Sequence, residues 1–262
     1  MEFVLDGRRV YAGTGGRVGD PAAPVVVLLH GAGMDHTIFA AQARALAHRG
    51  RSVLAFDLPG HGRSEGPALA SIAALAEWVL AAASACGAER FRLAGHSMGA
   101  LVALEAAARG GARVEALALI GFAPEMRVHP DLLAAARAGA PMAVELMTGW
   151  SFAAAGQLGG ARMPGVFLPG SALRLLERAD KESLAADLAA CDAYRGAADS
   201  AGRIRCPVLL LLGGADRMTP AAQARSFAPR FADARVSVLP AAGHLPMIEE
   251  PGPCLAALQE VL

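Results

Sequence analysis

The chain has 262 residues, in which 24 Lys and Arg are balanced by 24 Asp and Glu. This balance gives no reason to expect binding to nucleic acid or to an anionic membrane, so we expect a small-molecule substrate. Although 54% of the residues are hydrophobic, no apolar run reaches the roughly 18 residues of a membrane-spanning helix, and the length suits one domain with a sizeable core.

The N-terminal segment carries neither a targeting signal nor a cofactor motif. It lacks the basic and apolar regions of a signal peptide, so we expect a cytoplasmic protein. The segments at 3–5 and 8–11 flank Asp6-Gly7, a two-residue turn that predicts a β-hairpin. No helical pattern follows the glycines at 13–16, which argues against a dinucleotide site, and we expect no cofactor.

The next strand leads into a loop broken by glycines. Apolar residues at 25–29 predict a buried strand, H-G-A-G follows at 30–33, and a helical pattern covers 38–46. Such a loop can direct a backbone N–H group at a site formed with other segments. A further apolar strand at 53–56 is followed by D-L-P-G-H-G-R-S at 57–64.

The most informative segment is G-H-S-M-G at 95–99, which lies between an apolar strand at 91–95 and a helical pattern at 100–108. This places Ser97 on a strand-to-helix turn so tight that glycines are needed two residues before and after it. The turn exposes the hydroxyl, and the helix N-terminus directs the N–H of Met98 toward an oxyanion formed when the serine attacks a carbonyl. Ser97 is therefore the candidate nucleophile.

Strands and helical patterns alternate along most of the chain, which predicts a parallel sheet covered by helices on both faces. After a strand at 115–120, residues 124–203 depart from this alternation and are too long for a simple crossover. Helical patterns lie at 131–138, 141–148, 171–179 and 181–195. The alternation resumes with strands at 207–212 and 235–239, which lead to Asp216 and His244 at their carboxyl ends.

From about residue 24 to the C-terminus, the sequence resembles the α/β-hydrolase superfamily. H-G-A-G, D-L-P-G-H-G-R-S, G-H-S-M-G, G-G-A-D and A-G-H occur in the order typical of that superfamily, and so do its serine, aspartate and histidine. The resemblance implies an α/β-hydrolase fold with a mostly parallel eight-stranded sheet. It also implies a core of residues 1–123 and 204–262, with a helical lid at 124–203 that roofs the site.

The residue types indicate nucleophilic catalysis by serine. A hydroxyl is a weak nucleophile until an imidazole takes its proton, which assigns His244 as the base and Asp216 as the acid that orients it. Glu125, just past the preceding strand, is the alternative acid. The cysteines, four in number, are widely spaced and lack a C-x-x-C pair, so we expect neither a metal site nor a disulfide framework.

The resemblance also implies which groups surround the reacting carbonyl. The backbone amides of Ala32 and Met98 are expected to bind the oxyanion, and Gly33 is both the alternative donor and a candidate pocket residue. Within the lid, Met147 and Trp150 are the main candidates for the wall of an acyl or aromatic pocket. The other apolar candidates in that segment are Met142, Leu146, Phe152, Met163 and Phe167.

These residues predict a serine hydrolase that cleaves a small or medium carboxylic ester through an acyl-enzyme intermediate. Hydrolysis of a carbon–carbon bond and opening of a lactone are the enzymatic alternatives, because the superfamily includes both. A small-molecule receptor without turnover is the alternative of another class. The sequence leaves the oligomeric state open.

Overall fold

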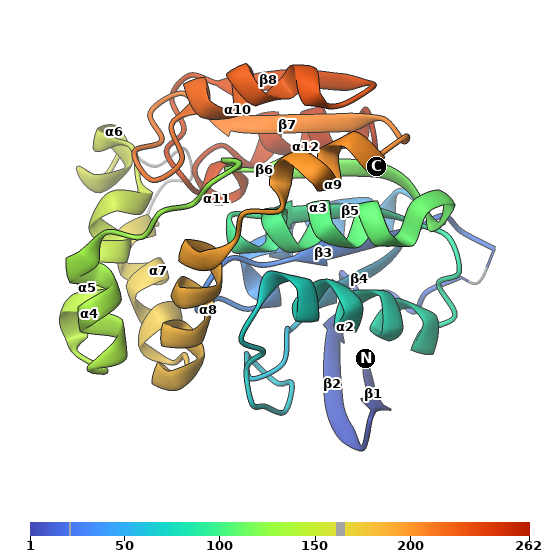
Figure 1. Cartoon of the computed structure of the whole chain (residues 1–262), viewed down its shortest axis with the longest axis horizontal. Helices are drawn as coiled ribbons and strands as arrows, with labels where there is room; N and C mark the ends of the chain where they lie inside the picture. The colour runs from blue at the N-terminus through green and yellow to red at the C-terminus, as the bar shows by residue number, and fades with distance from the viewer. Residues whose placement is uncertain (21, 161–165) are drawn as a thin grey trace.

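A computed structural model of the chain describes residues 1–20, 22–160 and 166–262, and an eight-stranded sheet lies at its centre (Figure 1). The strands are β1 (Glu2–Leu5), β2 (Arg8–Gly13), β3 (Val25–Leu29), β4 (Ser52–Phe56), β5 (Phe91–His96), β6 (Val114–Ile120), β7 (Val208–Gly213) and β8 (Ala234–Leu239). Their order across the sheet is β1-β2-β4-β3-β5-β6-β7-β8. The pairs β1/β2 and β2/β4 are antiparallel and all other neighbours are parallel, which confirms the predicted mostly parallel sheet.

The N-terminal hairpin forms at the predicted turn. Asp6 and Gly7 have φ angles of 50° and 76°, as a two-residue turn of type I′ requires of both its central residues. Leu5 and Arg8 therefore pair directly across the turn. The hairpin adds the two antiparallel strands at one edge of the sheet.

Helices cover both faces of the sheet (Figure 1). The core helices are α1 (Ala40–His48), α2 (Ile72–Ala85), α3 (Met98–Gly110), α9 (Ala197–Arg203), α10 (Ala221–Phe227), α11 (Pro246–Glu249) and α12 (Pro251–Gln259). On one face α3 packs between α2 and α9, while α1 and α12 pack together on the other. No helix in the described part of the chain has the length and apolar character to cross a bilayer.

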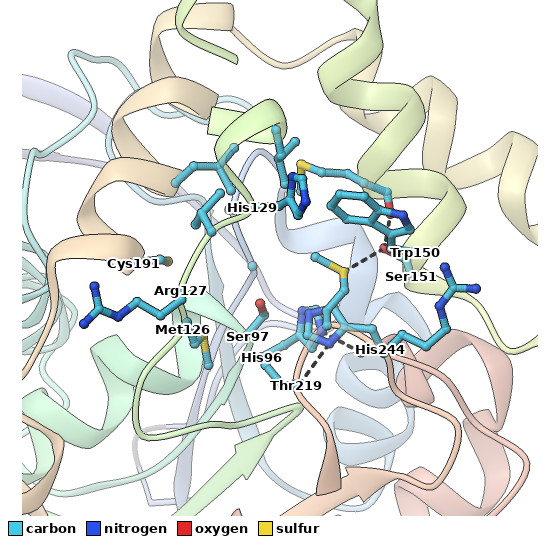
Figure 2. A pocket seen from close by; sticks show the side chains of 18 of the residues that line it. His96, Ser97, Met126, Arg127, His129, Trp150, Ser151, Cys191, Thr219 and His244 are labelled. Carbon is cyan, nitrogen blue, oxygen red and sulfur yellow. Dashed lines mark hydrogen bonds between the residues drawn. The ribbon is translucent and has the colours of Figure 1, made fainter. Parts of the chain in front are cut away.

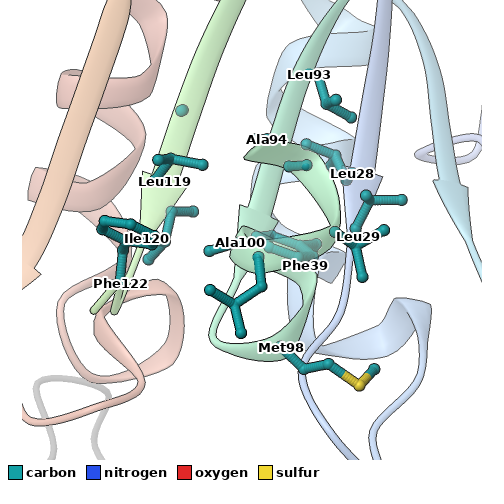
Figure 3. Close-up of a cluster of buried hydrophobic side chains, with 14 of the residues drawn as sticks. Leu28, Leu29, Phe39, Leu93, Ala94, Met98, Ala100, Leu119, Ile120 and Phe122 are labelled. Atoms are coloured by element: carbon teal, nitrogen blue, oxygen red, sulfur yellow. The ribbon is translucent and has the colours of Figure 1, made fainter. Parts of the chain in front are cut away.

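The central strands read as continuous apolar runs because the helices bury both of their faces. Every residue of β4 and β7 is buried, as are all residues of β3 after the first. Figure 3 shows Leu29, Leu93 and Ile120 of three neighbouring strands in the same buried cluster as Met98 at the start of α3. This packing holds the carboxyl end of β5 in place.

The segment between β6 and β7 forms a helical insertion at the carboxyl ends of the strands (Figure 1). Its described helices are α4 (Pro130–Arg137), α5 (Pro141–Ser151), α6 (Ala154–Gln157), α7 (Leu168–Glu177) and α8 (Lys181–Ala193). Four of these correspond to the predicted helical patterns, but α6 has only 4 residues, too few to show a helical period. Met163, a predicted pocket residue, lies outside the described residues.

The first turn of α3 lies unusually close to the end of β3. A Cβ atom placed on Gly99 would lie 2.4 Å from the carbonyl oxygen of Leu29 and 2.5 Å from that of His30. A Cβ atom on Gly95 would lie 1.9 Å from the carbonyl oxygen of Gly99. Both glycines are therefore required for the strand, the helix and the loop after β3 to meet.

We expect Gly99→Ala to destabilise the fold by about 1–3 kcal/mol or more, because the added methyl group must displace backbone rather than a side chain. Gly202→Ala in α9 is a matched control, since nothing lies within 4 Å of a Cβ atom there. That change should stabilise the helix by about 0.5–1 kcal/mol. Denaturant unfolding measures both effects, and a Gly99→Ala variant of wild-type stability would contradict the close contact.

Candidate active site

Ser97 lies at the turn between β5 and α3, as predicted. Its φ of 53° and ψ of −117° are strained for a residue with a side chain, and they turn the hydroxyl away from the backbone. The Ser97 N–H donates to the carbonyl of Ile120 at 2.9 Å, and its own carbonyl accepts from the N–H of Ala100 at 2.8 Å. Bonds to β6 and to α3 thus hold the strained turn in place.

His244 and Asp216 meet beside this turn. His244 Nδ1 donates to Asp216 Oδ2 at 2.8 Å, and the two side chains are only 3% and 1% exposed. Because a carboxylate only accepts, Nδ1 carries the hydrogen and Nε2 holds a lone pair, which is the tautomer that a general base needs. Figure 2 shows the His244 ring and the Ser97 hydroxyl in the same cavity.

Asp216 is held in its ionised form. Its Oδ1 accepts the N–H groups of Met218 and Thr219 at 2.8 and 2.9 Å, and its Oδ2 accepts the Thr219 hydroxyl at 2.7 Å. Burial alone would raise the pKa of Asp216, but the His244 ring and the Thr219 donors outweigh it and lower the pKa below its ordinary value. The negative charge can therefore stabilise an imidazolium at His244.

Two other buried histidines at this edge of the sheet are neutral. His96 Nε2 donates to the carbonyl of His244 at 2.8 Å, and burial lowers the pKa of His96 to about 3. His30 Nδ1 donates to the carbonyl of Gly31 at 2.8 Å, while its Nε2 accepts the N–H of Leu58 at 3.1 Å. Burial lowers the pKa of His30 to about 4. Both rings hold neighbouring backbone segments in place through hydrogen bonds.

A buried carboxylate holds the loop that carries the candidate base. Glu249 accepts the N–H groups of Gly243 and Leu245, at 2.8 and 3.2 Å, and that of Ala153 in the helical insertion at 2.9 Å. Burial raises the pKa of Glu249 even though the three amides oppose that shift. The backbone N–H of His244 itself donates to the carbonyl of Ser151 at 2.7 Å. The insertion is thus bonded directly to the base loop.

The structure distinguishes between the amides considered as oxyanion donors. Met98 begins α3, so its N–H has no carbonyl to pair with inside the helix. Ala32 lines the cavity together with Ser97, and its N–H has no acceptor among the described residues. Gly33 N–H donates to Asp187 Oδ2 at 2.9 Å, so the alternative donor is already engaged.

A cavity of about 310 Å³ lies between Ser97 and the helical insertion (Figure 2). Apolar side chains form much of its wall, including Met126, Leu132, Met147, Trp150 and Leu188. The predicted pocket residues Met147 and Trp150 therefore border the site. Gly33 does not line this cavity; it borders a smaller one of about 160 Å³. Leu176 and Leu184 pack against it.

The sequence reasoning missed His129 and Thr219. His129 lines the cavity, accepts the N–H of Asp131 at 3.3 Å as the N-cap of α4, and packs edge-on against Trp150 with ring centroids 5.6 Å apart. Its place before a proline and an aspartate could have indicated the cap but not the contact with the indole ring. Thr219 follows Asp216 by three residues, and that spacing alone gave no sign of its bonds.

Glu125, the alternative acid, lies apart from the His244 ring. The Glu125 side chain is exposed and pairs with Arg127 at 3.4 Å, so the structure brings Asp216 to His244 instead.

Asp35, His36 and Asp57 place ligand atoms within 4.8 Å of one another. However, Asp57 accepts from the backbone N–H and the ring Nδ1 of His36 and from the N–H of Arg63, and Asp35 accepts from Thr37. These groups satisfy one another, and we assign no metal to them.

Comparison with known proteins identifies the family. Residues 26–257 match the profile of the alpha/beta hydrolase family. The chain is 32% identical over 262 residues to the pimeloyl-[acyl-carrier protein] methyl ester esterase of Aromatoleum aromaticum, which covers 91% of this chain and 98% of that protein. It is also 32% identical over 266 residues to the esterase of the same name from Chromobacterium violaceum, with 91% and 94% covered.

Among solved structures, the enol-lactonase from Burkholderia xenovorans LB400 superposes with a TM-score of 0.88 at 28% identity, covering 99% of this chain and 98% of that one. The sequence matches extend over nearly the whole chain, and the sheet order and the strained serine turn agree with them. The chain therefore belongs to the alpha/beta hydrolase family.

Proposed function

We propose that this protein is a serine hydrolase that cleaves a small or medium carboxylic ester through an acyl-enzyme intermediate. The observation that carries the proposal is the bonded His244–Asp216 pair in the same apolar cavity as the strained Ser97. Two relatives are named as methyl ester esterases and a structural neighbour as an enol-lactonase, which supports chemistry at an ester bond.

Each residue has one role in the proposed mechanism. His244 Nε2 takes the hydroxyl proton as Ser97 Oγ attacks the ester carbonyl, and the Ala32 and Met98 amides bind the resulting oxyanion. The imidazolium, stabilised by Asp216, then gives its proton to the departing alcohol, leaving the acyl group on the serine. Water, activated by the same imidazole, attacks the acyl group and releases the acid.

Lactone opening is the second candidate, and the likeness to an enol-lactonase favours it. The chemical steps are the same, except that the alcohol stays attached to the acyl chain and must be accommodated beside Ser97 during deacylation. We further propose that the helical insertion acts as a lid over the cavity, with Trp150 in its lining face. Cytoplasmic residence stays a prediction.

A fluorophosphonate should modify the protein at one site, Ser97, because the base and the oxyanion donors raise the reactivity of that hydroxyl alone. Mass spectrometry of the digested protein locates the adduct. Ser97→Ala should lose both labelling and ester turnover while keeping its melting temperature. Hydrolysis that survives in this variant would refute the mechanism, and labelling without turnover of esters, lactones or diketones would favour a receptor.

Asp216→Asn should lower kcat by an amount on the order of 10⁴-fold, the size of the corresponding effect in a serine protease, because the amide favours the wrong tautomer of His244. Glu125→Gln is the matched control, since this exposed side chain pairs with Arg127 away from the base. Steady-state kinetics on an activated ester compares the two variants. Our assignment of the acid is wrong if the Glu125 variant is the damaged one.

Trp150→Ala should reduce kcat/KM for long or aromatic acyl groups by roughly 10-fold or more, while a small acetyl ester is hydrolysed at nearly the wild-type rate. The reason is that only a larger acyl group reaches this part of the wall. Met142→Ala is the control, because Met142 lies on the same helix with 49% of its surface exposed. An equal loss on all substrates, with a lowered melting temperature, would show that the indole ring serves packing instead.

A further inference from the structure

Asp187 of α8 is a fully buried carboxylate that the proposed mechanism does not use. Its Oδ2 accepts the N–H of Gly33 at 2.9 Å and faces His61 Nε2 at 2.8 Å. Its Oδ1 has no partner among the described residues. The Oδ2 atom of Asp187, which belongs to the insertion, therefore bonds to two core loops, the loop after β3 and the loop after β4.

The partners of His61 require a proton on each ring nitrogen. Nδ1 lies 3.0 Å from the carbonyl oxygen of Pro59, and Nε2 faces the Asp187 carboxylate. A peptide carbonyl and an ionised carboxylate only accept hydrogen bonds, so these contacts fit an imidazolium that faces a carboxylate. Burial alone would lower the pKa of His61, but the charge of Asp187 outweighs it and raises the pKa. The adjacent His30 ring, 5.0 Å away, is neutral and adds no charge.

Gly33 sits where the insertion presses on the loop after β3. Its φ is +66°, and a Cβ atom there would lie 2.8 Å from Leu184 Cδ1 and 3.3 Å from Leu176 Cδ2. The loop thus has little room to move sideways. The orientation of its peptide plane depends on the bond that the Gly33 N–H makes to Asp187.

We propose that Asp187 is a positioning residue for the oxyanion loop, an inference that rests on the proposed function. By holding the Gly33 N–H, the carboxylate fixes the peptide that joins Ala32 to Gly33, and so fixes the backbone of Ala32, whose own N–H is the assigned oxyanion donor. His61 neutralises the carboxylate, so that its charge does not oppose the oxyanion. A side chain from the insertion thereby orders a donor in the core.

The first test measures kcat and KM for Asp187→Asn and Asp187→Ala on an activated ester. Losing an oxyanion donor outright costs about 10²–10³ in kcat, so disordering one should cost about 10-fold to 100-fold, with KM changed by less than about threefold. Asn keeps an oxygen that can accept from Gly33 and should lose less than Ala. Wild-type kcat in both variants would overturn the role of Asp187.

A second readout separates positioning from general stability. A trifluoromethyl ketone forms a tetrahedral adduct with an active serine, so its affinity should weaken in parallel with kcat/KM across the variants. The affinity for an ether analogue of the substrate, in which a methylene group replaces the carbonyl so that no oxyanion can form, should stay within about twofold of the wild-type value. Equal weakening of both ligands would indicate a distorted pocket and overturn the proposal.

Ser183→Ala provides the matched control. Ser183 lies on the same helix and its hydroxyl donates to the carbonyl of Gly60 at 3.0 Å, so it also anchors α8 to the core but does not touch the oxyanion loop. We expect its kcat to stay within about twofold of wild type, even where its melting temperature falls as far as that of Asp187→Asn. A matching loss of kcat in Ser183→Ala would mean that any anchor of α8 has the same effect.

Failure of the proposed function is recognisable separately, because wild-type protein would then not react with a fluorophosphonate at Ser97. A reactive wild type together with fully active Asp187 variants overturns only the positioning role. Should neither variant fold, amide hydrogen exchange in the wild-type protein decides. Exchange at Gly33 slowed by about 10²-fold or more supports the bond to Asp187, and exchange as fast as in an unfolded peptide overturns it.

Discussion

The close approach of α3 to the end of β3 governs the geometry of the site. No side chain fits between Gly99 and the carbonyl groups of Leu29 and His30, so the helix start, the strand end and the following loop have one arrangement. Ser97 takes its strained conformation within that arrangement. The two proposed oxyanion donors belong to opposite sides of the same contact, one on the helix and one on the loop, so their separation is set by backbone packing.

Hydrogen-bond partners decide which of the buried histidines is suited to act as the base. His96 packs 4.8 Å from His244, ring to ring, and its Nδ1 has no partner among the described residues. Its pKa of about 3 makes it too weak a base to take a serine proton. Both ring nitrogens of His61 face hydrogen-bond acceptors, and both nitrogens of His30 are engaged with backbone. His244 is left with an ionised partner on one nitrogen and a lone pair on the other.

The sheet and the positions of the candidate residues could be predicted because their signals are local. The apolar run at 25–29 coincides with β3, and the glycines around Ser97 identified the turn before any contact was known. Asp187 and Glu249 could not be predicted in this way. Their bonds join residues 154 positions apart in the first case and 96 in the second, and nothing in the surrounding sequence distinguishes either acid from a solvated one.

The same limit explains what the sequence implied for Gly33. The motif placed its amide near the reacting carbonyl, but only the fold shows that a carboxylate from α8 occupies that N–H and that leucines cover the residue. Prediction of the insertion was limited in the same way, because α6 is too short for a helical period to be visible in the sequence. The role that we propose for it as a lid depends on motion, which a pattern of apolar residues does not encode.

Glu249 links the loop of the candidate base to the end of α5 that borders the cavity, so that the two segments cannot shift independently. Its carboxylate holds the amides beside His244 and the amide of Ala153, which follows Trp150 by three residues. During divergence toward new substrates, changes that shift the backbone at Ala153 would disturb the base and reduce the rate. Met126 and Leu132 lie on a part of the wall to which Glu249 makes no bond in the described chain. Substrate range can therefore evolve there with the chemistry left intact.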